Sequence, residues 1–488
     1  MNITMEQPEK ETRKNRLIPT FEHLGKIVLS KKDGGYLYFC AVTASLLVFS
    51  GCSCIVWSSP VIPKLKSEDA EENPLGEPIT TLQISLITGL PSFVALLGNF
   101  VFAKMPNAFG RKATMLLISF GMLASLLLVA FGNHVYMYSA GLCFLFICVA
   151  GVYVALPLYL SEISEDHNRG RILSLIGVLM PLGNLYGYLL GPITSIRTFT
   201  LLLALPLVVH LFLVFMYLPE SPVYLVSKKQ TPAAMCSLIK LRKNKNSVEI
   251  EDEYFKIDQT LKARENFKER GMKELFTNRS VRKALLISLC VNLTQQLSGV
   301  ISILKFLAPV FNEVSTSFAG NKVAILVGLV KFVSFFISSC LVEKLGRRPL
   351  LLTSAFGSCI SLFLIGLFFF LKQHTSVAID NITWLPISSV LVFNFMYALG
   401  IGTLSITVMN EMLPTDVKAV GSALVFTICY LLGSSQVFLF PLISEHFGIF
   451  YCVWSFSVCC LLGFVFMFIF LPETKGKSFL EIQAILET

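Results

Sequence analysis

Charged residues recur at matching places in the two halves of the chain, next to the ends of long apolar runs. Gly-Arg-Lys at 110–112 is matched by Gly-Arg-Arg at 346–348, and the carboxylates of Glu162 and Glu411 follow later apolar runs. Opposite charges at neighbouring helix ends pair in one arrangement of a protein and separate in another. The spacing therefore indicates a charge latch on an element with two states, rather than covalent catalysis.

The basic members of this set have a second explanation, because lysine and arginine also flank membrane spans and fix their orientation. Glu162 and Glu411 are not needed for that purpose, so these two carboxylates favour the latch. The residues that we expect in it are Arg111, Glu162 and Arg169 in the first half, and Glu343, Arg347, Glu411 and Lys418 in the second.

Two lysines, Lys305 and Lys331, lie deep inside apolar runs. An unpaired lysine at the middle of a membrane costs about 2.5 to 3.5 kcal/mol, so each should face a partner or a water-filled cavity. Lys305 shares a helical stripe with Ser298, and Lys331 shares one with Gly328 and Ser334. One interpretation is a cationic pocket for a sugar acid, a sugar phosphate or another anion. The other is that Lys305 reaches the membrane interface and Lys331 bonds backbone carbonyls.

Other kinds of chemistry find no support in the residue pattern. The chain has no Gly-x-x-x-x-Gly-Lys-Ser/Thr string for nucleotide phosphates. The apolar runs hold no cluster of histidine, cysteine and acid, and the 13 cysteines show no paired spacing across polar loops. We therefore expect no catalytic residue, no metal and no cofactor.

The elements that carry these residues are membrane spans. Of 488 residues, 54% are hydrophobic and only 15% are charged, and the mean hydropathy is +0.69. Twelve apolar runs of about twenty residues, the length that crosses a bilayer, lie between Tyr36 and Leu471. The sequence predicts an all-α membrane protein with the lipid bilayer as its solvent.

The repeated strings lie about half a chain apart, which predicts a duplicated unit of six spans on each side of a polar connector. The expected parts are an N-terminal segment (1–35), a first six-helix bundle (36–218), a helical linker (219–282), a second six-helix bundle (283–471) and a C-terminal tail (472–488).

Charge predicts the orientation of these spans. Lys26, Lys31 and Lys32 precede the first span, whereas Glu68 and Asp69 belong to a largely acidic first loop. Basic residues remain on the cytoplasmic side, so we expect cytoplasmic N- and C-termini. The expected location is the plasma membrane. The formal charge of +9 flanks spans instead of forming a patch with interleaved aromatics, so nucleic acid is not an expected partner.

Seven strings, in order and each at a span end, resemble the sugar-porter family of the major facilitator superfamily. Within it the chain is most similar to the facilitated trehalose transporters of insects. The strings include Pro-Leu-Tyr-Leu-Ser-Glu-Ile at 157–163, Leu-Pro-Glu-Ser-Pro at 218–222, Gln-Gln-Leu-Ser-Gly at 295–299 and Leu-Pro-Glu-Thr-Lys-Gly at 471–476. The resemblance implies two bundles with alternating access to a central sugar site, and Gln295, Gln296 and Asn184 as sugar-binding residues.

The site departs from the family pattern at several positions. Ile301 stands where the family has an asparagine that bonds a sugar hydroxyl, and the stretch 400–406 lacks the family's two prolines and tryptophan. Lys305 replaces a gate tyrosine, Lys331 replaces a polar amide, and Gly177 replaces a glutamine. A buried hydroxyl without a partner costs about 1 to 3 kcal/mol, so these changes oppose an ordinary hexose site.

Two further alternatives follow from residues that are missing. Proton-coupled members carry an aspartate in the first span, whereas 36–57 contains no acid, so we expect facilitated diffusion. The altered pocket also fits a nutrient receptor that no longer transports, although retention of the latch residues argues for a working carrier.

Asn-Ile-Thr at 381–383 is an acceptor sequence for glycosylation. It lies next to Trp384 at the start of an apolar run, which leaves the glycosylating enzyme little room above the membrane. We therefore expect Asn381 to stay mostly unmodified.

Overall fold

The computed structural model describes residues 34–69, 71–265, 275–276, 278–312, 314, 320–375, 382–414, 417–475 and 481. Asn381 lies outside these ranges. Glu343 lies in a described helix, but its side chain is outside the described part.

All regular structure in the described ranges is helical, and twelve stretches are long and apolar enough to cross a membrane. The first six spans are α2 (Gly35–Ile55) with α3 (Ser58–Leu65), α4 (Thr81–Thr88) with α5 (Leu90–Phe109), α6 (Arg111–Ala130), α7 (Val135–Ile163), α8 (Arg169–Leu190) and α9 (Ile196–Tyr217). The other six are α14 (Arg279–Leu297) with α15 (Val300–Asn312), α16 (Gly320–Leu345), α17 (Arg347–His374), α18 (Trp384–Leu399) with α19 (Ile401–Met412), α20 (Lys418–Phe447) and α21 (Ile449–Phe470).

These spans form two six-helix bundles, as in the major facilitator fold. In the first bundle α7 packs on α5 and α6, and α2 packs on α8 and α9. In the second, α17 packs on α18 and α21, and α14 packs on α19 and α20. The bundles meet where α8 contacts α16, where α3 contacts α15, and where α4 and α5 contact α20.

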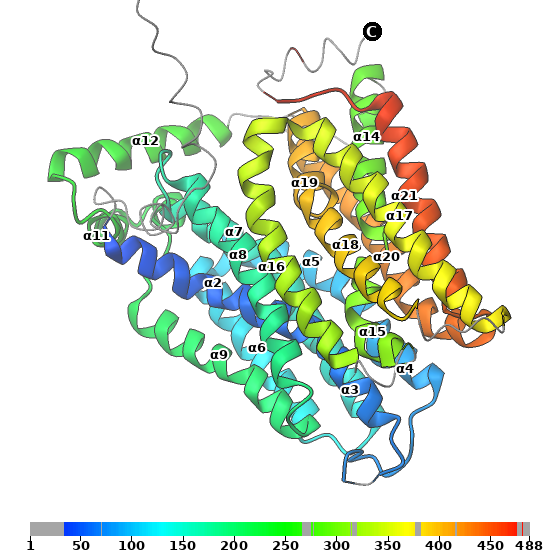
Figure 1. Ribbon diagram of the computed structural model, residues 1–488. Helices are drawn as coiled ribbons and strands as arrows, with labels where there is room; N and C mark the ends of the chain where they lie inside the picture. The colour runs from blue at the N-terminus through cyan, green and yellow to red at the C-terminus, as the bar shows by residue number, and fades with distance from the viewer. Residues whose placement is uncertain are drawn as a thin grey trace, which may run out of the picture.

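The polar segment between the bundles forms the helices α10 (Pro222–Ser227), α11 (Thr231–Leu241) and α12 (Ser247–Glu265). Figure 1 shows α11 and α12 at one end of the molecule, with α3, α4 and α15 toward the opposite end. We call the end nearest α11 and α12 the linker end, and the opposite end the far end.

Several spans are interrupted, and glycine permits two of the breaks. Gly299, between α14 and α15, has a φ of +77°, and a Cβ there would lie 2.1 Å from the ring of Phe456. A Cβ on Gly400, between α18 and α19, would lie 2.3 Å from the carbonyl oxygen of Leu350. Spans one and seven, which occupy matching places in the two halves, are both broken. Interrupted helices at matching places point to the solute path of a carrier.

Candidate functional site

Helix α15 joins the two bundles at the far end, and Pro309 leaves backbone groups of this helix free to bond across the interface. Proline has no N–H, so the carbonyl of Lys305, four residues earlier, has no helical donor. The helix departs from α geometry at Phe306, with φ of −112° and ψ of 16°. The hydroxyl of Ser58 in α3 donates to the carbonyl of Lys305 at 3.1 Å. A side chain of the first bundle thus replaces a helical hydrogen bond of the second.

The same break releases two more backbone groups. The N–H of Ala308 donates to Ser59 Oγ at 3.1 Å, and Tyr188 Oη donates to the carbonyl of Leu304 at 2.9 Å. Buried backbone groups need partners, so these bonds fix α15 against α3 and α8. We call this set the far-end junction; it comprises Ser58, Ser59, Thr88, Ser92, Phe146 and Tyr188 of the first bundle with Leu304, Lys305 and Ala308 of the second.

The ammonium group of Lys305 also belongs to the junction. Lys305 Nζ donates to the carbonyl of Thr88 at 2.7 Å and to Ser92 Oγ at 2.9 Å. It also lies 4.6 Å from the centre of the Phe146 ring. The residue is only 2% exposed, so these contacts with three helices of the first bundle replace its hydration. Lys305 therefore links the bundles, and its ammonium group is enclosed by protein.

Lys331 meets the first bundle separately. With the amide of Asn184 oriented to satisfy both neighbours, its nitrogen donates to the carbonyl of Cys52 at 2.8 Å and its oxygen accepts from Lys331 Nζ at 3.0 Å. Tyr153 Oη lies 3.4 Å from Cys52 Sγ. The structure thus brings together two of the expected solute-binding residues, Asn184 and Lys331, on facing helices α8 and α16.

The two expected glutamines lie on the last turn of α14, next to the breaks in spans seven and ten. Gln295 Nε2 donates to the carbonyl of Gly402 at 3.3 Å, and Gln296 lies against Gly433 of α20. Tyr397, which lies in no motif of the sequence, is beside Gln295. Glutamine and tyrosine side chains supply the mixed donors and acceptors that a polyol requires.

The single pocket expected to contain both lysines is not what the contacts show. Lys305 Nζ is held by Thr88 and Ser92 in the far-end junction, while Lys331 Nζ is held by Asn184. Each ammonium group has its own partners across the bundle interface. In this arrangement only Lys331 belongs to the group that includes Asn184.

At the linker end, the predicted latch residues form ion pairs within each bundle. Arg111 Nη2 lies 2.7 Å from Glu162 Oε1, with side chains only 7% and 9% exposed. Arg347 Nη2 lies 3.2 Å from Glu411 Oε1, with side chains 22% and 26% exposed. Ser221 Oγ of the linker also donates to Glu162. The pairs brace α6 against α7 and α17 against α19.

The remaining latch residues have other neighbours. Arg169 pairs with Asp166 at 3.0 Å, and Lys418 Nζ donates to the carbonyl of Asn410 at 2.9 Å. Both contacts are local to one bundle. A latch that joins the two bundles stays a prediction for the state in which the linker end closes.

Two carboxylates outside the predicted set hold the same helix ends. Glu220 accepts from the backbone N–H groups of Arg111 and Lys112, and Glu473 accepts in the same way from Arg347 and Arg348. A carboxylate at a helix N-terminus satisfies free N–H groups and the helix dipole. Burial would raise the pKa of Glu473, but bonds from the backbone N–H groups of Lys475, Arg347 and Arg348 lower it below its usual value. In the sequence, the repeated Leu-Pro-Glu string was the signal that could have pointed to Glu220 and Glu473.

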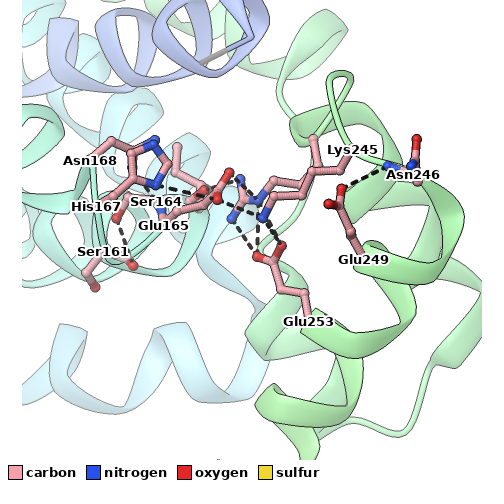
Figure 2. A network of polar contacts seen from close by, with 11 residues as sticks. Ser161, Ser164, Glu165, His167, Asn168, Lys245, Asn246, Glu249 and Glu253 are labelled. Atoms are coloured by element: carbon pink, nitrogen blue, oxygen red, sulfur yellow. Dashed lines mark hydrogen bonds and ion pairs between the residues drawn. The ribbon is translucent and has the colours of Figure 1, made fainter. Parts of the chain in front are cut away.

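The linker is attached to the first bundle through an ion-pair cluster, which we call the linker clasp. Arg242 lies 3.2 Å from Glu165 and 2.8 Å from Glu253. Lys245 lies 2.7 Å from Glu165 and 3.1 Å from Glu253, and Figure 2 shows Lys245 between the two carboxylates. Arg242 Nη1 also donates to the carbonyl of Ile163. The clasp fixes α12 next to the latch pair of the first bundle.

Two bundles that are joined at the far end, with broken helices and polar groups along their interface, define a membrane carrier of the two-bundle type. The family model described as "Sugar (and other) transporter" matches residues 39–486, and the chain belongs to this family. This bears out the resemblance expected from the sequence.

Among curated relatives, the chain is 29% identical over 410 residues to "Facilitated trehalose transporter Tret1" of Bombyx mori, covering 83% of this chain and 79% of the relative. It is 28% identical over 465 residues to the protein of that name from Culex quinquefasciatus, covering 94% and 88%.

Solved structures of similar fold include the "inward open conformation of the xylose transporter XylE from E. coli". It has a TM-score of 0.73 at 20% identity and covers 91% of this chain and 98% of that chain. The "partially occluded inward open conformation" of the same transporter has a TM-score of 0.71 at 18% identity, with coverage of 90% and 100%. At these identities the likeness concerns the fold.

Proposed function

We propose that this chain moves a sugar or a related polar solute across the plasma membrane by alternating access, as facilitated diffusion. The linker end faces the cytoplasm and the far end faces outside. The observation that carries the proposal is the far-end junction in a chain of the sugar-transporter family, because it joins the bundles at one end of an interface lined by polar residues.

The junction fits a cycle because its bonds can be exchanged for water. Serine hydroxyls, a tyrosine hydroxyl and one ammonium group make them, and all of these groups are well solvated when exposed. The net contribution of one such hydrogen bond is about 0.5 to 1.5 kcal/mol. A few bonds therefore favour one state by an amount that solute binding can offset.

A sugar is the proposed solute class because glutamine and tyrosine side chains lie near the breaks in spans seven and ten, and Asn184 lies at the interface between α8 and α16. Gln295, Gln296 and Asn184 offer amide donors and acceptors. Helix α2 of the first span contains no aspartate or glutamate. This absence of a titratable carboxylate supports transport without a coupled proton. Trehalose, named for the curated relatives, is the first disaccharide to test.

Uptake of radiolabelled trehalose, glucose, sorbitol and organic anions into proteoliposomes tests this function. The double variant Ser59→Cys with Ala308→Cys places two cysteines across the junction contact and tests whether the junction must open. The two single variants are its matched controls. Oxidation should stop uptake, reduction should restore it, and each single variant should be insensitive. A wild-type chain that binds a sugar but moves none of these solutes would favour a receptor over a carrier.

Lys331 supports a second candidate, an anionic sugar derivative as the solute. In the described part of the chain its ammonium group has an amide neighbour, Asn184, and forms no ion pair with a carboxylate. A cation without a counter-charge favours an anion nearby. The test is the variant Lys331→Gln. If the solute is an anion, gluconate or glucose 6-phosphate should inhibit uptake by the wild type and should not inhibit uptake by this variant. Wild-type transport of a neutral sugar that no organic anion inhibits, and that Lys331→Gln leaves unchanged, would exclude this candidate.

A further inference from the structure

A cavity lies at the far end, beyond the junction. Its volume is about 500 Å³, which lies in the usual range for small-molecule sites. Phe306 belongs to its wall and directly follows Lys305 in α15, so the cavity lies against the closed junction. It is distinct from the residues around Asn184 and Gln295, none of which lines it.

Both bundles form this cavity. Lys66 and Thr81 come from the chain around α3 and α4 of the first bundle, whereas Gln373 and Glu445 come from α17 and α20 of the second. Walls from two bodies that separate during the cycle meet only while the far end is closed. The cavity therefore exists in one state of the carrier.

The lining is apolar on one side and polar on the other. Phe306 stacks on Phe440 with ring centres 5.0 Å apart, and Phe369 adds a third aromatic side chain. The polar side offers an ammonium group from Lys66 and a carboxylate from Glu445, both exposed, and neither forms an ion pair within the described ranges. The three rings are each 5% exposed or less, so they form the floor of the cavity. The ammonium, carboxylate, hydroxyl and amide groups of its polar side supply the mixed donors and acceptors that sugar hydroxyls need.

We propose that this far-end cavity is a second sugar site, of disaccharide size, that is open to the outside while the central site faces the cytoplasm. The inference rests on the proposed alternating access, with the far end facing outside. A ligand that binds only the closed far end multiplies the population of that state, relative to the open one, by one plus the ratio of ligand concentration to Kd. External sugar then delays the return to the outward-facing state, so high concentrations lower the maximal uptake rate.

Protection of an introduced cysteine tests the site directly. Ser444 lines the cavity, and Ser444→Cys in right-side-out vesicles can be reacted with a membrane-impermeant maleimide. Trehalose at twice its dissociation constant should slow labelling about threefold. Glu445→Gln in the same background should remove the protection. Glu68→Cys, in the loop between α3 and α4, is the matched control and should label at the same rate with or without sugar.

A third variant separates this site from the transport site. Protection of Ser444→Cys should persist with Gln295→Ala, because Gln295 lies on α14, away from the cavity. Protection that Gln295→Ala removes and Glu445→Gln preserves would overturn the proposal, since the sugar would then act through the central site. Equal labelling with and without trehalose, maltose or sucrose would overturn it as well. Protection in a chain that transports nothing would refute the proposed function and leave this site standing.

Discussion

The two ends of the interface between the bundles are held in different ways. At the far end, neutral hydroxyls and one ammonium group bond backbone groups across the interface, as Ser58 does with the carbonyl of Lys305. At the linker end, guanidinium and carboxylate groups pair inside one bundle, as Arg111 does with Glu162. The first arrangement must break in each transport cycle, whereas the second can persist.

The energies of these interactions fit this difference. A neutral hydrogen bond contributes about 1 kcal/mol, and water replaces it readily when the bundles part. Removing one partner of a buried ion pair costs about 3 to 5 kcal/mol, because the other charge stays buried. The moving parts are therefore joined by bonds that water can replace, whereas each rigid part contains a charge pair that is costly to leave half-complete.

The largest expected effect breaks a brace. Glu162→Gln leaves the buried Arg111 without its counter-charge, so unfolding free energy should fall by about 3 to 5 kcal/mol. Glu411→Gln affects a pair whose side chains are 22% and 26% exposed, so water partly screens the charge left behind and the loss should be smaller. Thermal unfolding of the purified variants in detergent measures both, and equal losses would refute the assignment of the stronger brace to the first bundle.

The same two variants test the latch. If the predicted latch exists, both should lower the uptake rate, because both carboxylates would then take part in closing the linker end. If Glu162→Gln and Glu411→Gln carry solute at the wild-type rate, the latch interpretation is wrong.

Lys305→Met should open the far end. The substitution keeps the length of the side chain but removes the bonds to Thr88 and Ser92. Charged hydrogen bonds contribute about 1.5 to 3 kcal/mol, so the closed population should fall about tenfold or more relative to the open one. Distances between spin labels at Lys66 and Gln373 report this shift. An unchanged distance distribution would show that the bonds of Lys305 do not stabilise the closed far end.

Ser58→Ala should produce a smaller shift in the same measurement, of about 1 kcal/mol. Pro309→Ala restores an N–H that can bond the carbonyl of Lys305 within the helix, so Ser58 is then no longer needed. The effect of Ser58→Ala should therefore decrease in the Pro309→Ala background. Additive effects would show that the proline does not create the free carbonyl.

The smallest effect concerns the linker clasp and pH. Burial would raise the pKa of Glu253, but Arg242 and Lys245 lower it below its usual 4.5. Burial would lower the pKa of Lys245, but Glu165 and Glu253 raise it above 10.5. The carboxylate stabilises the clasp above pH 4.5 and loses this effect as the pH falls through its lowered pKa. The ammonium group stabilises it below pH 10.5 and loses this effect as the pH rises through its raised pKa.

The clasp should therefore be strongest between pH 4.5 and 10.5. Amide hydrogen exchange in α12, corrected for the intrinsic rate, should accelerate at pH 3.5 relative to pH 7. Glu253→Gln should remove most of this difference, and Glu249→Gln, whose carboxylate contacts the N–H of Asn246, should not. If acid still accelerates exchange in α12 of the Glu253→Gln variant, a group other than Glu253 is responsible.

The fold could be predicted almost entirely from the sequence, because each span is a local property. Twenty apolar residues must form a helix in lipid, and the repeated charged strings indicate that six spans are duplicated. The need of Lys305 and Lys331 for polar neighbours could also be predicted. Their actual neighbours could not, since Thr88 lies 217 residues away from Lys305.

The sequence by itself determined that this chain crosses a membrane twelve times, belongs to a two-bundle architecture, and carries charged groups at its helix ends. Only the tertiary structure decided that Pro309 frees a carbonyl for Ser58, that Lys305 joins the bundles, and that Lys331 meets Asn184. Hydropathy and helix formation depend on neighbours along the chain. Partners across an interface depend instead on which helices pack together and in which state, and one sequence serves more than one such state.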